Sequence, residues 1–191
     1  ISGHADLDIA PTWSPDGERI AFSRSHDLVN DIHVMDADGG NLANLTNHFE
    51  NDTDPSWSPD GESIAFQRHR PGNQEAYVMR ADGGNPTDLS NHPEWDGHQA
   101  WSPDGERIVF VTRREGNSDV YVMDADGDNQ TNISDHPAED SRPAWSPDGE
   151  HIVFTSDRDG NDDIYIMDAD GRHQTNITNS PARETHATWT Q

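Results

Sequence analysis

The sequence predicts an all-β protein, a β-propeller of four-stranded antiparallel blades. Two observations carry this prediction. Tryptophan recurs at intervals of 44 residues without insertion or deletion, and each interval repeats the same order of strand and turn signals. Four short antiparallel strands within about 40–45 residues are typical of a propeller blade. The tryptophans that mark the repeats are Trp13, Trp57, Trp101, Trp145 and Trp189.

The third repeat shows the expected elements in order. A first strand ends in Ser-Pro-Asp-Gly, a turn in which proline presets φ and glycine permits a positive φ. A β-branched and aromatic run follows (RIVFVTR), then a Glu-Gly-Asn hairpin turn and an alternating strand (DVYVM). Asp-Gly then turns the chain into a short polar strand. The predicted strands are 100–102, 107–113, 119–123 and 130–134.

The repeat predicts one propeller domain over residues 1–191, with a first-type strand added after the last blade. Residues 1–15 and 177–191 occupy the same repeat position, and a closed four-bladed ring has room for one copy. Either the ring closes within one chain, or the chain is part of a larger ring, for example a homo-oligomer that shares blades or strands. The predicted blades are 8–46, 52–90, 96–134 and 140–178, and the added inner strand is 179–191.

The composition fits a thin, repeated core beneath a very acidic surface. Hydrophobic residues make up 30 % of the chain and the formal net charge is −25. Such a charge repels phosphate backbones, which excludes nucleic acid as a partner. No apolar run is long enough to insert into a membrane, and the absence of cysteine excludes disulfides and thiol chemistry. Arginine supplies all the basic residues, and this acidic, lysine-free surface is typical of halophilic proteins in a high-salt environment.

Several fixed strings recur in register through the whole chain. The string D-x-x-P-x-W-S-P-D-G-x-x-I-A-F is complete from Asp52 to Phe66, and D-I-Y-I-M-D-A-D-G runs from Asp163 to Gly171. These strings resemble the WD40-like (PD40) repeat of the TolB-type β-propellers. The resemblance implies a propeller that binds a protein or accompanies a catalytic domain, in a periplasmic or other extracytoplasmic location. TolB proteins carry an additional amino-terminal domain, and family propellers usually have six or more blades.

Two sets of repeated positions are candidates for binding. The residue three before each tryptophan should line one mouth of the central channel, and its identity varies, which favours recognition of a protein or peptide. An aspartate five before each tryptophan could contribute oxygen ligands to a central Ca²⁺, or it could brace its loop or the neighbouring blade by hydrogen bonds. The first set is Asp54, His98, Arg142 and His186, with Ala10 in the first repeat, and the second is Asp8, Asp52, Asp96 and Asp140.

No catalytic signature singles out one residue. The chain has neither a G-x-S-x-G nucleophile elbow nor an H-E-x-x-H motif, and most acids and bases recur in every repeat. The sequence therefore predicts a non-catalytic propeller that acts as a protein- or peptide-binding scaffold. Two alternatives remain open. The chain could be the propeller of a peptidase-like or lyase-like enzyme, or a recently amplified or engineered repeat scaffold with no selected ligand.

Overall fold

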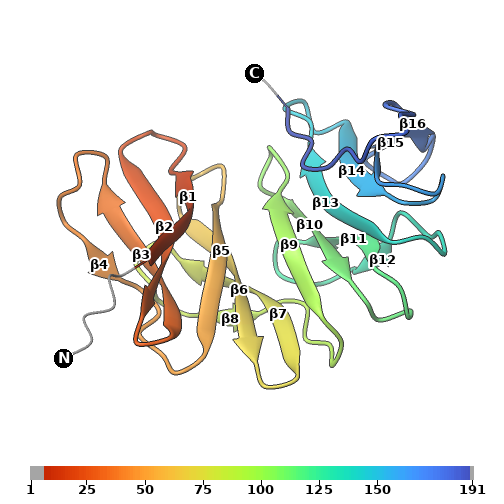
Figure 1. The fold of residues 1–191 in the computed structure, drawn as a ribbon. Coiled ribbons are helices and arrows are strands. Elements are labelled where there is room, and N and C mark those ends of the chain that lie inside the picture. The colour runs from red at the N-terminus through yellow and green to blue at the C-terminus, as the bar shows by residue number, and fades with distance from the viewer. Residues whose placement is uncertain (1–6, 190–191) are drawn as a thin grey trace. The chain divides into compact units, whose positions relative to one another are not determined.

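The computed structural model describes residues 7–189, which form sixteen β-strands in four antiparallel sheets of four strands each (Figure 1). Each sheet is a blade in which the strands follow in chain order, and this confirms the predicted all-β class. No described residues form a helix that is long and apolar enough to cross a membrane. Blade 1 contains β1 (Leu7–Trp13), β2 (Arg19–His26), β3 (Val29–Asp36) and β4 (Ala43–Asn44); blade 2 contains β5 (Asn51–Trp57), β6 (Ser63–Arg70), β7 (Asn73–Arg80) and β8 (Thr87–Asp88); blade 3 contains β9 (Asp96–Trp101), β10 (Arg107–Thr112), β11 (Asp119–Asp124) and β12 (Thr131–Asn132); blade 4 contains β13 (Asp140–Trp145), β14 (His151–Ser156), β15 (Asp163–Asp168) and β16 (Thr175–Asn176).

The Ser-Pro-Asp-Gly turn joins the first two strands of every blade through one set of hydrogen bonds. In blade 2 the Ser58 hydroxyl donates to the Asp60 carboxylate and accepts the N–H of Ser63 at 2.9 Å. The Ser58 hydroxyl, and next the Glu62 N–H, hold the pKa of Asp60 below its ordinary value. The same serine-to-aspartate bond joins Ser14 to Asp16, Ser102 to Asp104 and Ser146 to Asp148.

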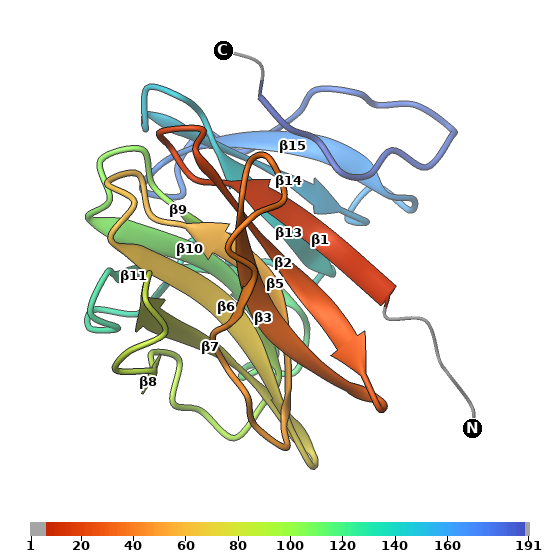
Figure 2. The same cartoon turned by 90° about the vertical axis from the view of Figure 1, so that its left-hand side faces the viewer.

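The contacts divide the chain, which the sequence predicts to be one domain, into two compact units. Unit 1 is Ile1–Asn91 and unit 2 is His92–Gln191. Each unit contains two blades, because unit 1 holds β1 to β8 and unit 2 holds β9 to β16. Figure 2 shows β1, β2 and β3 side by side within the first blade. The core of each unit lies between its two blades.

Blade 1 covers the first strand of blade 2 in unit 1. Trp57 at the end of β5 is only 7 % exposed, and the guanidinium carbon of Arg19 lies 4.6 Å from the centre of its ring. Burial of this apolar surface stabilises the pair of blades, as propeller packing requires. The cluster between the blades comprises Ala21, Ile32, Val34, Trp57, Ile64, Phe66, Tyr77 and Met79.

Unit 2 repeats this packing with a larger apolar cluster. Trp145 at the end of β13 is also 7 % exposed, and Arg107 of blade 3 lies 4.6 Å from its ring centre. Ile133, which follows β12, joins the core fully, whereas its counterpart Leu45 in unit 1 is only partly buried against the core. The cluster comprises Val109, Val120, Val122, Ile133, Trp145, Ile152, Phe154, Tyr165 and Met167.

The two ends of the chain differ from the repeat. Trp13 on β1 is 58 % exposed, in contrast to Trp57 and Trp145. The added strand predicted over 179–191 is not formed by residues 179–189, and residues 190–191 lie outside the described residues. A strand requires a ladder partner, and no described strand pairs with this segment. The indole of Trp189 instead donates one hydrogen bond of 3.2 Å to the Ala144 carbonyl.

Candidate functional site

The first strand of each blade is broken by an irregularity three residues before its tryptophan. The pairing register of each first strand with the second strand shifts at this point, as in a β-bulge, which re-aims a side chain out of the ladder. The residue there lies in the left-handed region of φ, a conformation that few residues other than glycine adopt. The values are +51° at Ala10, +54° at Asp54, +55° at His98 and +52° at Arg142. His186 lies on no strand but has the same repeat position and a φ of +63°.

These are the variable residues that the sequence analysis proposed for recognition. Asp54, His98 and His186 are exposed, and Arg142 is half-buried. Their charges differ between the units: unit 1 presents an alanine and an aspartate, whereas unit 2 presents two histidines and an arginine. The bulge thus holds the backbone constant while the side chain changes, an arrangement that suits selective contact with a partner.

The aspartates considered as calcium ligands are all paired with arginine. In unit 1 Asp52 is fully buried, and both its carboxylate oxygens accept hydrogen bonds of 2.8 Å from Arg68. Asp8 receives equivalent bonds of 2.6 and 2.7 Å from Arg24, although its side chain is 46 % exposed. The Asp8 pKa is lowered by the hydrogen bond from Arg24. These bidentate pairs join the first and second strands of one blade, whereas the sequence analysis considered a brace to the loop or to the neighbouring blade.

Unit 2 pairs its two aspartates with arginines from a different place in the chain. Arg158, in the turn after β14, donates to the buried Asp140 at 3.1 and 3.2 Å. Arg114, in the turn after β10, lies 3.4 Å from the buried Asp96. All four carboxylates thus have an arginine as a partner in the structure.

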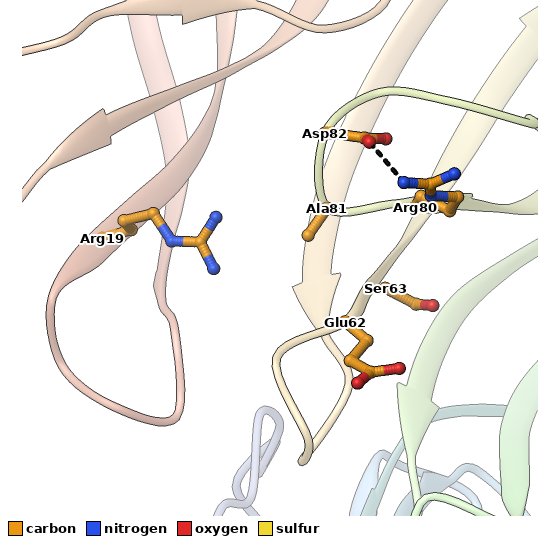
Figure 3. A pocket seen from close by; sticks show the side chains of 6 residues that line it. All are labelled: Arg19, Glu62, Ser63, Arg80, Ala81 and Asp82. Carbon is orange, nitrogen blue, oxygen red and sulfur yellow. Dashed lines mark hydrogen bonds and ion pairs between the residues drawn. The ribbon is translucent and has the colours of Figure 1, made fainter.

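A pocket of about 620 Å³ opens between blades 1 and 2 of unit 1 (Figure 3). Arg19 reaches into it from β2 toward Ala81. On the facing wall, which blade 2 forms, Arg80 donates a 2.6 Å hydrogen bond to Asp82. Opposite charges pair along this groove, so it carries little net charge. Its lining residues are Arg19, Glu62, Ser63, Arg80, Ala81 and Asp82.

Unit 2 has the equivalent pocket, of about 400 Å³, with a different charge. Asp168 stands at the position of Arg80, and His151 at the position of Ser63. His151, Asp148 and Glu150 each offer one ligand atom, and these three atoms lie within 4.8 Å of one another, so the set could hold a metal ion. Asp148 already accepts hydrogen bonds from Ser146 and the Glu150 N–H. The pocket is lined by Arg107, Glu150, His151, Asp168, Ala169 and Asp170.

Comparison with protein families places the chain directly. The TolB beta propeller domain, PD40, matches residues 1–99 and 86–191, which together span the sequence. The chain belongs to the PD40 family of TolB β-propeller domains. No curated protein matches the chain.

Solved structures similar to this PD40 chain include two TolB proteins. A putative TolB from Agrobacterium tumefaciens is 26 % identical with a TM-score of 0.79, and the match covers 87 % of this chain and 63 % of that protein. TolB from Acinetobacter baumannii is 24 % identical with a TM-score of 0.78, and the match covers 94 % and 45 %. The PD40 chain therefore spans between about half and two thirds of their lengths.

The fold alone is also shared with an enzyme. A structure from a study of two prolyl endopeptidases is 16 % identical, with a TM-score of 0.68 over 90 % of this PD40 chain and 28 % of that one. The propeller is thus a fold that occurs in proteins with different activities.

One part of the PD40 site could not be read from the repeat, because it occurs in blade 2 alone among the described blades. His69 lies between Thr53 and Gln74, with its Nε2 2.9 Å from the Thr53 hydroxyl and its Nδ1 2.5 Å from the Gln74 amide nitrogen. The Thr53 hydroxyl in turn donates to the Asp54 carboxylate at 3.0 Å. The departure of these residues from the repeat was the signal in the sequence that marks them.

Proposed function

We propose that this PD40 domain is a protein- or peptide-binding scaffold that works outside the cytoplasm, and that it binds through the bulge residues Asp54, His98 and Arg142 and through His186, which stands at the same repeat position. One observation carries the proposal: the bulge keeps the same left-handed backbone in every blade while its side chain changes. By contrast, the serine of the Ser-Pro-Asp-Gly turn is the same in all four blades, as its structural hydrogen bonds require. The TolB resemblance supports the location and the class of partner.

The length of the chain limits what its relatives contribute. It spans 63 % of one TolB protein and 45 % of the other, so partners of those proteins are not transferred to it. These four residues themselves carry the chemistry proposed here: a carboxylate in unit 1, and imidazoles and a guanidinium in unit 2. The carboxylate of unit 1 suits a basic side chain of a ligand, and the imidazoles and guanidinium of unit 2 suit an acidic one.

The test is a peptide selection followed by substitution of the bulge. Peptides selected from a displayed random library on the wild-type protein are measured against the triple variant Asp54→Asn, His98→Asn, Arg142→Asn. Asparagine tolerates the left-handed conformation, so the backbone is kept and the charged groups are lost. We expect the affinity to fall about tenfold or more, since a few residues dominate most interfaces.

The matched control removes the same residue types elsewhere. Asp126, Arg172 and His173 are exposed turn residues, and the triple variant Asp126→Asn, Arg172→Asn, His173→Asn should bind the selected peptides as the wild type does. Calorimetric titration of both variants decides the matter. Equal affinity of the bulge variant and the control would remove the basis of the proposal.

A further inference from the structure

The hydrogen bonds around His69 run in one direction, and the ionised Asp54 carboxylate sets that direction. A carboxylate can only accept, so the Thr53 hydroxyl must donate to it and must accept from His69 Nε2–H. In a neutral imidazole the other nitrogen is then an acceptor, so Gln74 turns its amide N–H toward Nδ1. The Gln74 carbonyl oxygen consequently accepts from Gln67 at 2.9 Å.

This series of hydrogen bonds occurs only in blade 2 among the described blades. The Asp54 N–H is held as well, by a 3.2 Å hydrogen bond to the Ser23 hydroxyl of blade 1. Thr53 and Gln67 are buried. The hydrogen-bonded residues Thr53, His69, Gln74 and Gln67 therefore form a fixed support beneath the exposed Asp54 carboxylate. The residues at the Thr53, His69 and Gln74 positions are Gly97, Arg113 and Ser118 in blade 3, and Ser141, Asp157 and Asp162 in blade 4.

A pocket of about 310 Å³ lies beside this support, and His69 lines it. Phe49 and Pro71 give it an apolar wall; the Phe49 side chain is 79 % exposed and stacks on His48 at 4.3 Å between ring centres. Arg70 also lines it, but that guanidinium lies 3.4 Å from Glu50 and 3.5 Å from Asp88. Asp54 does not line this pocket; it is linked to the lining residue His69 by two hydrogen bonds through Thr53.

We infer that Asp54 binds a basic side chain of the peptide ligand, next to an apolar side chain seated against Phe49 and Pro71, and that His69 is the positioning residue that orients Asp54. This inference rests on the proposed function and names the chemistry that blade 2 selects. A guanidinium is the expected partner, because its planar donors match a carboxylate held in one orientation.

The support depends on His69 being neutral. A proton on Nδ1 would face the Gln74 amide N–H, donor against donor, and would bring a positive charge within two hydrogen bonds of the bound cation. The charged groups that act on His69 are Asp54 and Asp52 from β5, with Arg70 and Glu50 in the same pocket. Burial, the largest cause, lowers the His69 pKa. Affinity for a cation should therefore be full near neutral pH and fall as pH drops through this lowered value.

The experiment compares two dipeptide probes that differ in charge alone. Acetyl-Phe-Arg-amide and acetyl-Phe-citrulline-amide are titrated into the full chain, with the His69 ring protons and backbone amides followed by NMR. We expect the arginine probe to bind about fivefold more tightly at pH 7.5, as for an exposed ion pair of about 1 kcal/mol. The preference should vanish in Asp54→Asn and persist in Asp126→Asn.

The pH profile of binding distinguishes a His69 that orients Asp54 from a His69 that only stabilises the fold. In the wild type the preference for arginine should decline as pH falls through the lowered His69 pKa, whereas in His69→Gln, which has no titrating ring, it should be smaller and constant. Equal binding of the two probes to the wild type, or a preference that survives in Asp54→Asn, would overturn the inference. The same His69→Gln profile as the wild type would remove His69 from the role given to it.

Failure of this inference can be told apart from failure of the proposed function. If the probes bind equally while the triple bulge variant still loses the selected peptides, the surface binds peptides and Asp54 does not choose a basic side chain. If the triple bulge variant keeps those peptides, the bulge itself is excluded as the binding surface.

Discussion

The two units pair the same aspartate of the repeat with arginines from different positions in the chain. In unit 1 the arginine lies on the second strand directly opposite the aspartate, as Asp52 pairs with Arg68 and Asp8 with Arg24. In unit 2 a hydroxyl residue occupies that opposite position, Ser156 in blade 4. The arginine comes two residues later, from the turn, and reaches back to Asp140.

Both arrangements bring the guanidinium to the same place. Arg68 lies 4.6 Å from the ring centre of Tyr77, and Arg158 lies 4.5 Å from that of Tyr165. The longer reach in unit 2 is fixed by further bonds, from Arg158 to the Ser156 hydroxyl at 2.8 Å and to Gln174 at 2.7 Å. In both units a guanidinium lies over the tyrosine ring and beside the aspartate. The sequence position of the arginine that supplies it differs between the units.

The largest expected effect comes from removing a buried arginine. Arg68→Met and Arg158→Met each leave a fully buried carboxylate without its main partner, so each should lower the free energy of unfolding by about 3–5 kcal/mol. Arg24→Met leaves Asp8, whose side chain is 46 % exposed, and should cost about 1 kcal/mol or less. Urea denaturation of the three variants measures the differences. A loss in Arg24→Met equal to that in Arg68→Met would show that burial does not set the cost.

A smaller effect is expected when the arginine of unit 2 is moved to the position used in unit 1. Arg158→Ser alone should lose about 3–5 kcal/mol. Adding Ser156→Arg places a guanidinium directly opposite Asp140, so the double variant should recover to within about 1–2 kcal/mol of the wild type, the remainder being the lost bond to Gln174. A double variant as unstable as the single one would mean that the turn position is itself required.

The strands and turns could be predicted because their causes are local. Ser58, Asp60 and Gly61 belong to one turn, and their hydrogen bonds join residues five or fewer positions apart. The period of the tryptophans likewise predicts the blades. The added strand failed as a prediction because a strand depends on a partner elsewhere in the chain, and residues 179–189 have none among the described strands.

The candidate site was predictable in its positions and not in its geometry. Asp54 and His98 are of types that are enriched at positive φ, but Ala10 and Arg142 are not, so their left-handed backbone follows from the bulge rather than from the residue. The pairing of Asp140 with Arg158 spans 18 residues of sequence, and no local rule distinguishes it from the pairing over 16 residues in unit 1. The support under Asp54 depends on the coincidence of Thr53, His69 and Gln74 across three strands.

The smallest expected effect is a dependence of stability on pH that belongs to unit 1. Burial lowers the His69 pKa, so the unfolded chain, with an ordinary value of about 6.5, takes up a proton first as pH falls. The contribution of neutral His69 to the free energy of unfolding is therefore fully present above about pH 6.5 and is lost as pH falls through the lowered folded value. The difference in unfolding free energy between the wild type and His69→Gln should shrink across that window.

The counterpart in unit 2 provides the control for this difference. Arg113 of blade 3 stands at the His69 position and donates a 3.1 Å hydrogen bond to Ser118. Arginine stays protonated throughout this range, so the difference between the wild type and Arg113→Gln should be constant from pH 7.5 to 5. Urea denaturation across that range measures both differences. If the two vary alike with pH, the titrating group lies elsewhere; if the His69 difference alone shrinks, the pH dependence belongs to the neutral imidazole of blade 2.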